Sequence, residues 1–274
     1  MIIFLLLAGC FAWISNKIYS HYYIQTEDAY VNANVVRIAP RVTGKVTQVY
    51  VSNNQYVKKG DALFDLDPES FQVALDEANA QLAVSKAELD KTSMIQQRTL
   101  ALVKRKFLSQ QDGDNVIANY KTALAKVAQA KARLEQAQLN LTYTKVLAPI
   151  SGQISNMSLR AGDMVAINQA LFALISDDLF WVDANFKETE MAAIKPGQSA
   201  RIVTDLYPDH VFHGVVESIS GSSGTAFSLL PAQNASGNWI KVAQRIPVRI
   251  RILNPNQNTP LRIGISAAAT VHLS

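Results

Sequence analysis

Two stretches of this sequence, APRVTGKVTQVYVSNNQYVKKGDALFDL at residues 39–66 and APISGQISNMSLRAGDMVAINQALFAL at residues 148–174, share one pattern and decide the fold. From Gly44 and Gly152 onward, matching residues lie a constant 108 positions apart. The matched apolar positions are Val57 and Val165, Leu63 and Leu171, Phe64 and Phe172, and Leu66 and Leu174. Short β-branched runs between Gly and Asn turns are typical of strands. Because each unit is too small to bury its own apolar face, we expect the halves to pack face to face as one small β-sandwich.

The segment between these halves has the composition of helices. Residues 68–142 contain no proline after Pro68 and a single glycine, Gly113, and are rich in Ala, Gln, Lys and Leu. Apolar and small residues recur at heptad spacing in two arms, which predicts an antiparallel coiled-coil hairpin roughly 50 Å long. The expected seam comprises Leu75, Ala78, Leu82, Ser85, Leu89 and Thr92, then Tyr120, Ala123, Val127, Ala130, Leu134, Ala137 and Leu141.

A turn must separate the two arms, and we place it at residues 107–110. Ser109 is followed three residues later by Asp112. This spacing resembles a capping box, in which two side chains satisfy free backbone N–H groups at the start of a helix. The second arm should therefore begin directly after Ser109.

The last third of the chain again has the pattern of strands. Strand-like runs occupy residues 211–219, 242–252 and 267–273, with Gly, Pro and Asn turns between them. Residues 188–194 could form one short helix. Several short strands with this punctuation predict a small β-barrel or sandwich over residues 179–274.

The N-terminus carries the one long apolar run, IIFLLLAGCFAWI at residues 2–14. Counted to Ile18, the run is just long enough to cross a membrane, and tyrosines follow at the expected interface. No basic residue precedes Lys17, so the n-region of a cleaved signal peptide is missing. An uncleaved anchor is favoured. The alternative is lipidation of Cys10, since Leu7 to Cys10 resembles a bacterial lipobox.

Composition excludes several classes of function. Hydrophobic residues make up 49% and charged residues 18%, which argues against wholesale disorder. The net charge is +4, without a dense Lys/Arg cluster interleaved with aromatics, so we expect no nucleic-acid binding. A single cysteine and four scattered histidines offer no metal cluster. Nucleotide-binding glycine loops and a Gly-x-Ser-x-Gly motif are absent from the sequence, so we expect no enzyme.

Five runs of the sequence carry a resemblance to a known family: TEDAYV at 26–31, APRVTG at 39–44, NNQYVKKGD at 53–61, WVDANFKET at 181–189 and GTAFSLLPAQNASGNWIKVAQRIPVRI at 224–250. With the order of the segments, these runs resemble the membrane fusion proteins, or periplasmic adaptors, of the HlyD secretion family. The run at 224–250 is similar to the signature of the EmrA-type multidrug export adaptors. The resemblance covers residues 26–274.

This resemblance implies a fold class that is mainly β plus α. A lipoyl-like β-sandwich is split by the long antiparallel coiled-coil hairpin and followed by a β-barrel domain, with an N-terminal membrane anchor. The implied boundaries are 1–24 for the anchor, 35–67 with 145–178 for the lipoyl-like domain, 68–142 for the hairpin, and 26–34 with 179–274 for the barrel. The hairpin replaces the tip that carries a modified lysine in true lipoyl and biotinyl carriers, so no cofactor is expected.

The resemblance also implies a function and partners. The chain would be the periplasmic adaptor of a tripartite multidrug efflux system, anchored by a single pass in the inner membrane of a Gram-negative bacterium. It would join a major-facilitator drug/proton antiporter of the EmrB type to a TolC-like outer-membrane channel, as a trimeric or hexameric ring. Alternatives are an adaptor for aromatic carboxylic acid efflux or type I protein secretion, and, from another class, a lipoyl or biotinyl carrier subunit.

A further match lies near the expected hairpin tip. Arg98, Leu102 and Ser109 stand at spacings of four and seven. They resemble the Arg-Leu-Ser motif through which adaptors of this family dock on the channel, and an arginine fork beside an apolar anchor suits exposed helix ends. The competing interpretation is a solvated arginine, a seam leucine and a helix cap. Two departures from the family are a shorter hairpin than in the longest EmrA-type proteins and the lack of a basic N-terminal stub.

Overall fold

The computed structural model describes residues 22–223, 243–253 and 259–273. Residues 1–21 of the expected anchor, with Cys10, lie outside these residues, as does most of the run at 224–250. In the described part of the chain, no helix is both long and apolar enough to cross a membrane. The chain divides into two compact units, residues 36–174 and a second unit formed by residues up to 35 together with those from 175 onward.

The first unit contains the split β-sandwich. One sheet has the order β5-β4-β2-β7, from β2 (Gly44–Val49), β4 (Ala62–Leu66), β5 (Lys145–Leu147) and β7 (Met164–Val165). Opposite it, β3 (Tyr56–Val57) pairs with β6 (Gly152–Ser155), which lies beside the start of β8 (Phe172–Lys187). The core between them is led by fully buried large side chains, Leu63, Phe64, Leu66, Ile154 and Leu174.

The two halves of the repeat exchange strands, which corrects the expectation that they would pack face to face. Gly44 of the first half pairs with Val165 of the second, and Gly152 of the second pairs with Val57 of the first. Each sheet therefore contains strands from both halves. The two-residue strands β3 and β7 are too short to form a sheet by themselves, and by crossing over they give β6 and β2 a second partner.

Four turns of the sandwich share one design and preserve the offset of 108 residues. In each, a carboxylate or amide oxygen accepts a hydrogen bond of 2.8–3.1 Å from the backbone N–H three residues earlier. The third residue of each turn has a positive φ, which Gly and Asn tolerate best. These residues are Asn54 (64°), Gly60 (93°), Gly162 (99°) and Asn168 (62°). The sequence repeat is thus a structural repeat.

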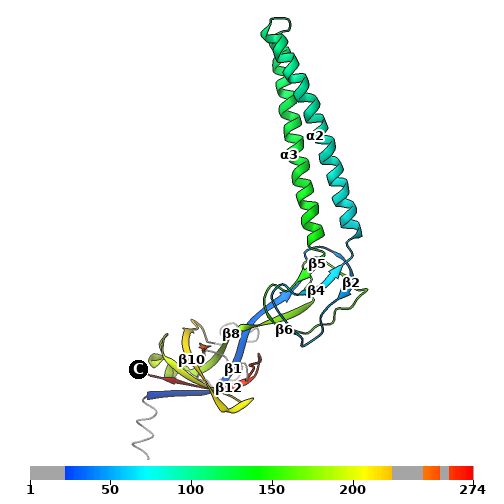
Figure 1. Ribbon diagram of the computed structural model, residues 1–274. Helices are drawn as coiled ribbons and strands as arrows, with labels where there is room; N and C mark the ends of the chain where they lie inside the picture. Colours follow the sequence, from blue (N-terminus) through cyan, green and yellow to red (C-terminus); the bar gives the residue numbers. More distant parts are fainter. Residues whose placement is uncertain (1–21, 224–242, 254–258, 274) are drawn as a thin grey trace, which may run out of the picture. The chain divides into compact units, whose positions relative to one another are not determined.

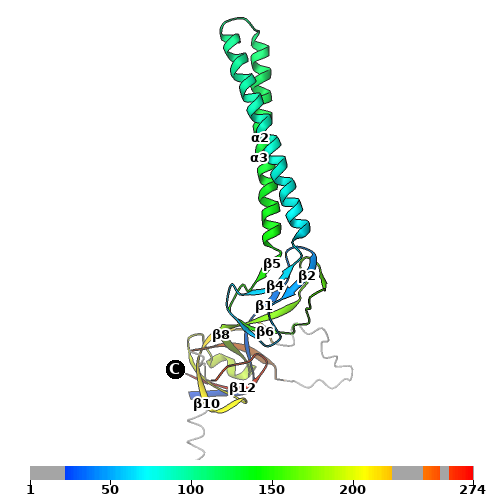
Figure 2. The same ribbon diagram turned by 45° about the vertical axis from the view of Figure 1, so that its right-hand side comes forward.

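Between β4 and β5 the chain forms the predicted hairpin, from α2 (Glu69–Lys104) and α3 (Gln110–Thr142) (Figures 1 and 2). The heptad seam is confirmed, since Ser85, Ala123 and Ala130 are buried along the facing sides of the two helices. Small residues at these positions let the helix backbones approach closely. Val84, one residue from Ser85, is 63% exposed, so the apolar seam is narrow.

In the described residues, the second unit is a closed barrel of six strands. Its strands run in the order β1-β12-β9-β10-β11-β8, and pairing of β1 with β8 closes it. They are β1 (Tyr23–Ile38), β9 (Ser199–Thr204), β10 (Tyr207–Ile219), β11 (Arg245–Ile252), β12 (Ser266–His272) and the later part of β8. Alternate residues fill the interior, as in β12, where Ala267, Ala269 and Val271 are buried. The expected short helix is confirmed as a 3-10 helix, η1 (Glu188–Ala193).

Candidate functional site

The hairpin turn begins with a C-terminal cap that ends α2 after Lys104. Lys106 adopts a left-handed conformation (φ 62°), where glycine is usual. Its backbone N–H donates to the Val103 carbonyl at 2.8 Å, and that of Phe107 donates to the Leu102 carbonyl at 3.0 Å. These two bonds form the Schellman arrangement, which satisfies carbonyls left free at a helix end. The turn therefore holds Phe107 at a defined place.

The second helix begins at the predicted residue. The Ser109 side chain accepts a bond of 3.2 Å from the Asp112 backbone N–H, and Asp112 Oδ2 accepts one of 3.1 Å from the Ser109 backbone N–H. The Ser109 hydroxyl also donates to Asp112 Oδ2 at 2.6 Å. The capping box is confirmed. Since both side chains are engaged with each other, Ser109 acts first as a structural cap.

Arg98 and Leu102 lie one helical turn apart on an exposed face of α2. Arg98 is exposed, and Leu102 is 42% exposed while its neighbour Val103 takes the seam position. The interpretation of Leu102 as a seam residue is therefore wrong. Arg98 lies six residues before the end of α2, about 9 Å along the helix axis. Ser109 lies across the turn, at the start of α3.

The tip also presents residues that sequence reasoning did not select. Phe107 is 74% exposed and Leu108 39% exposed, so two large apolar side chains face solvent at the turn. Three consecutive cations, Lys104, Arg105 and Lys106, precede them. The run KRKFL at residues 104–108 could have predicted this exposure. It lies in the turn between the two helical arms, where an aromatic side chain has no facing helix to pack against. The tip thus combines apolar contact area with positive charge.

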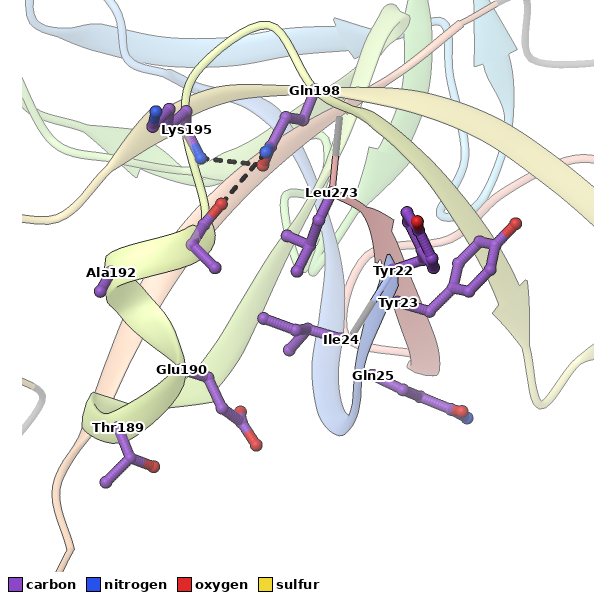
Figure 3. A pocket seen from close by; sticks show the side chains of 11 residues that line it. Tyr22, Tyr23, Ile24, Gln25, Thr189, Glu190, Ala192, Lys195, Gln198 and Leu273 are labelled. Atoms are coloured by element: carbon purple, nitrogen blue, oxygen red, sulfur yellow. Dashed lines mark hydrogen bonds between the residues drawn. The ribbon is translucent and has the colours of Figure 1, made fainter. Parts of the chain in front are cut away.

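The barrel contains a cavity of about 670 Å³ (Figure 3). Ile24 and Leu273 form an apolar wall, and Glu190 of η1 lies across from them. The buried Gln198 side chain fixes the end of η1: it accepts from the Lys195 backbone N–H at 2.8 Å and donates to the Ala193 carbonyl at 3.1 Å. No histidine or cysteine lines the cavity among the described residues.

Two carboxylates that flank Leu66, Asp65 and Asp67, have structural roles. Asp65 accepts a bond of 2.8 Å from the Tyr50 hydroxyl, and this bond raises the pKa of Tyr50. Asp67 accepts from the Glu69 backbone N–H at 3.0 Å, at the start of α2. These two carboxylates are thus engaged separately. In residues 22–223, 243–253 and 259–273, no three His, Cys, Asp or Glu side chains are grouped as a metal site requires.

A sandwich interrupted by a helical hairpin and followed by a β-barrel defines the class of membrane fusion proteins. Residues 34–177 match the family model of the RND MFP barrel-sandwich hybrid domain, and residues 179–273 match the AAEA-like beta-barrel domain.

Named relatives agree with these matches. The multidrug export protein EmrA of Haemophilus influenzae is 33% identical, over 91% of this chain and 76% of that protein. The probable multidrug resistance protein EmrK of Escherichia coli is 34% identical, over 99% and 82%. Among solved structures, the membrane fusion protein Spr0693 of Streptococcus pneumoniae has the same fold, with a TM-score of 0.68 at 18% identity over 92% and 99% of the two chains. The chain belongs to the membrane fusion protein family and is of the EmrA type.

Proposed function

We propose that this chain is the periplasmic adaptor of a tripartite multidrug efflux system. It joins an EmrB-type major-facilitator antiporter in the inner membrane to a TolC-like channel in the outer membrane. The adaptor is not an enzyme: it forms part of a conduit, while the antiporter couples export to the proton gradient. Membership of the EmrA-type branch is the observation that carries this proposal, because the relative EmrA of Haemophilus influenzae is named a multidrug export protein.

The hairpin tip supports docking to a channel. Residues 98–114 contain four cations (Arg98, Lys104, Arg105, Lys106) and two acids (Asp112, Asp114), a balance of +2. Beside this charge lie the exposed Leu102, Phe107 and Leu108. Aromatic residues and arginine are enriched at protein interfaces, so an exposed phenylalanine flanked by arginines is typical of one. We infer that these anchors enter an apolar groove between channel helix ends, with the cations meeting acidic groups at its rim.

Within this interface, Arg98 and Leu102 contact the channel, whereas Ser109 contributes by fixing the turn. The Ser109 hydroxyl is already bonded to Asp112 at 2.6 Å, so its direct contribution to binding is secondary. The adaptor assembles as a trimeric or hexameric ring, and its N-terminal segment anchors it in the inner membrane with the remaining chain in the periplasm. Anchoring by the apolar run of residues 2–14 or by a lipid on Cys10 would both give this arrangement.

Reconstitution of drug resistance tests the proposal. The full chain is expressed with an EmrB-type antiporter in a susceptible Gram-negative strain that has its own efflux adaptors deleted. Resistance to several chemically unrelated drugs should rise only when the adaptor, the antiporter and a TolC-like channel are all present. Resistance that persists without the channel would contradict the proposal, as would resistance that the antiporter confers equally without the adaptor.

A further inference from the structure

The outer wall of the barrel carries a shallow cleft of about 330 Å³ that the adaptor role does not use. It lies over β9, β10 and β12, where Arg201 is paired in register with His213 on one side and with Thr270 on the other. Residues paired in register point to the same face of a sheet. Arg201 thus stands at the centre of a row that also offers an imidazole and a hydroxyl.

Among the residues that the structure describes, the positive charge of Arg201 has no counter-charge in this cleft. Elsewhere on the barrel, Arg245 and Arg249 are paired with Asp28 and Asp183, each at 3.5 Å. In the described residues, by contrast, the Arg201 side chain makes no hydrogen bond or ion pair, and no Asp or Glu lines the cleft. The guanidinium is charged at every physiological pH and presents five N–H donors in a planar fork.

Further donors and an apolar wall surround Arg201. The His213 and His272 imidazoles and the Ser199 hydroxyl line the same cleft. The His272 ring packs edge-on against the Tyr23 ring, with centroids 5.0 Å apart, which orients it. Val215 and Leu253 supply apolar surface, and Leu253 is 38% exposed. The cationic Arg201 beside accessible apolar side chains favours a ligand with a negative head and a short apolar tail.

We propose that this cleft binds a single oxyanion, a carboxylate or phosphate, carried on a short apolar chain. The Arg201 fork holds two oxygens of the head in parallel, which is its strongest mode of binding. Ser199, Thr270 and the two imidazoles provide the remaining donors, while the tail lies against Val215 and Leu253. This chemistry is supplied by soluble amphiphilic anions and by anionic membrane lipids. The site is separate from the hairpin tip and goes beyond the adaptor function.

The four histidines of the chain provide a local probe, because two of them, His213 and His272, line the cleft. The full chain, labelled with ¹³C at histidine, is placed in phosphatidylcholine nanodiscs and titrated with sodium octanoate while the histidine resonances are followed by NMR. We expect saturable shifts of His213 and His272 and none of His210. Uncharged octanol should give no such shifts.

Variants distinguish specific binding at Arg201 from a nonspecific attraction of octanoate to positive charge. Arg201→Gln should weaken octanoate binding at least tenfold, equivalent to about 1.4 kcal/mol, and Arg201→Lys should restore only part of it. The matched control is Arg160→Gln, an exposed arginine in a turn of the other unit, which should change nothing. Equal shifts with octanol, no saturable shift below the concentration at which octanoate forms micelles, or full binding by Arg201→Gln would each overturn the proposal.

A second experiment identifies the source of the anion. Nanodiscs that contain phosphatidylglycerol, without octanoate, should shift the same two resonances if membrane lipid occupies the cleft. If only octanoate shifts them, the natural ligand is a soluble amphiphile. Saturable octanoate shifts, with or without phosphatidylglycerol shifts, support the anion site, and their absence refutes it.

Discussion

Reversing the charge of Arg98 separates docking from folding. In the described part of the chain, the Arg98 side chain is exposed and makes no hydrogen bond or ion pair. Glutamate also has high helix propensity, so Arg98→Glu should change the free energy of unfolding by less than about 0.5 kcal/mol. If Arg98 donates to an acceptor on the channel, the lost bond is worth about 1.5–3 kcal/mol. The affinity for the channel should then fall by roughly tenfold to a hundredfold.

The assay is binding of the full chain to a purified TolC-like channel by surface plasmon resonance, alongside thermal unfolding by circular dichroism. Arg133→Glu is the matched control, since it makes the same reversal on exposed α3 surface about 35 Å from the start of that helix. The expected result is weak binding by the Arg98 variant, near-normal binding by the Arg133 variant and unchanged unfolding of both. Unchanged binding by Arg98→Glu, or equal loss by both variants, would refute a specific docking role.

Three further changes test the local structure by thermal and denaturant unfolding. Ser109→Ala removes the capping box and should cost about 1 kcal/mol; no loss would mean that the cap contributes nothing. Gly113→Ala should stabilise the hairpin by roughly 0.5–1 kcal/mol, because the added Cβ would lie 3.5 Å from the Leu100 side chain, an ordinary contact; destabilisation would show that the helices are closer at the tip. Gln198→Ala leaves two backbone groups of the barrel without partners and should cost about 1–3 kcal/mol. The same change at the exposed Gln169, which makes one such bond, should cost less, and equal losses would contradict the argument from burial.

The hairpin could be predicted from sequence because its determinants are local. Heptad spacing depends on one helix at a time, and it correctly placed Ser85, Ala123 and Ala130 at the buried seam. The Ser109 cap depends on a single residue three positions away, Asp112, and could therefore also be predicted from the sequence. Contacts that span a few residues leave a periodic signal in the sequence.

Strand partners could not be predicted in the same way. Alternation shows which face of a strand is buried but not which strand lies beside it. The exchange of β3 and β7 between the two halves, and the closure of the barrel by β1 and β8, are therefore found only in three dimensions. At the tip, the run KRKFL indicates an exposed Phe107, but the left-handed conformation of Lys106 that ends α2 could not be predicted, because this conformation is far more common for glycine.

The central claim, that the hairpin tip meets an outer-membrane channel, is tested most directly by photo-crosslinking in living cells. A photoreactive phenylalanine analogue replaces Phe107, which is 74% exposed at the turn, in a strain that contains the antiporter and the channel. As the control, the analogue replaces Val84, which is 63% exposed and lies 20 residues before the end of α2. We predict a covalent adduct between position 107 and the channel, and no such adduct from position 84. Absence of the channel adduct at position 107, or an equal adduct from position 84, would contradict the account.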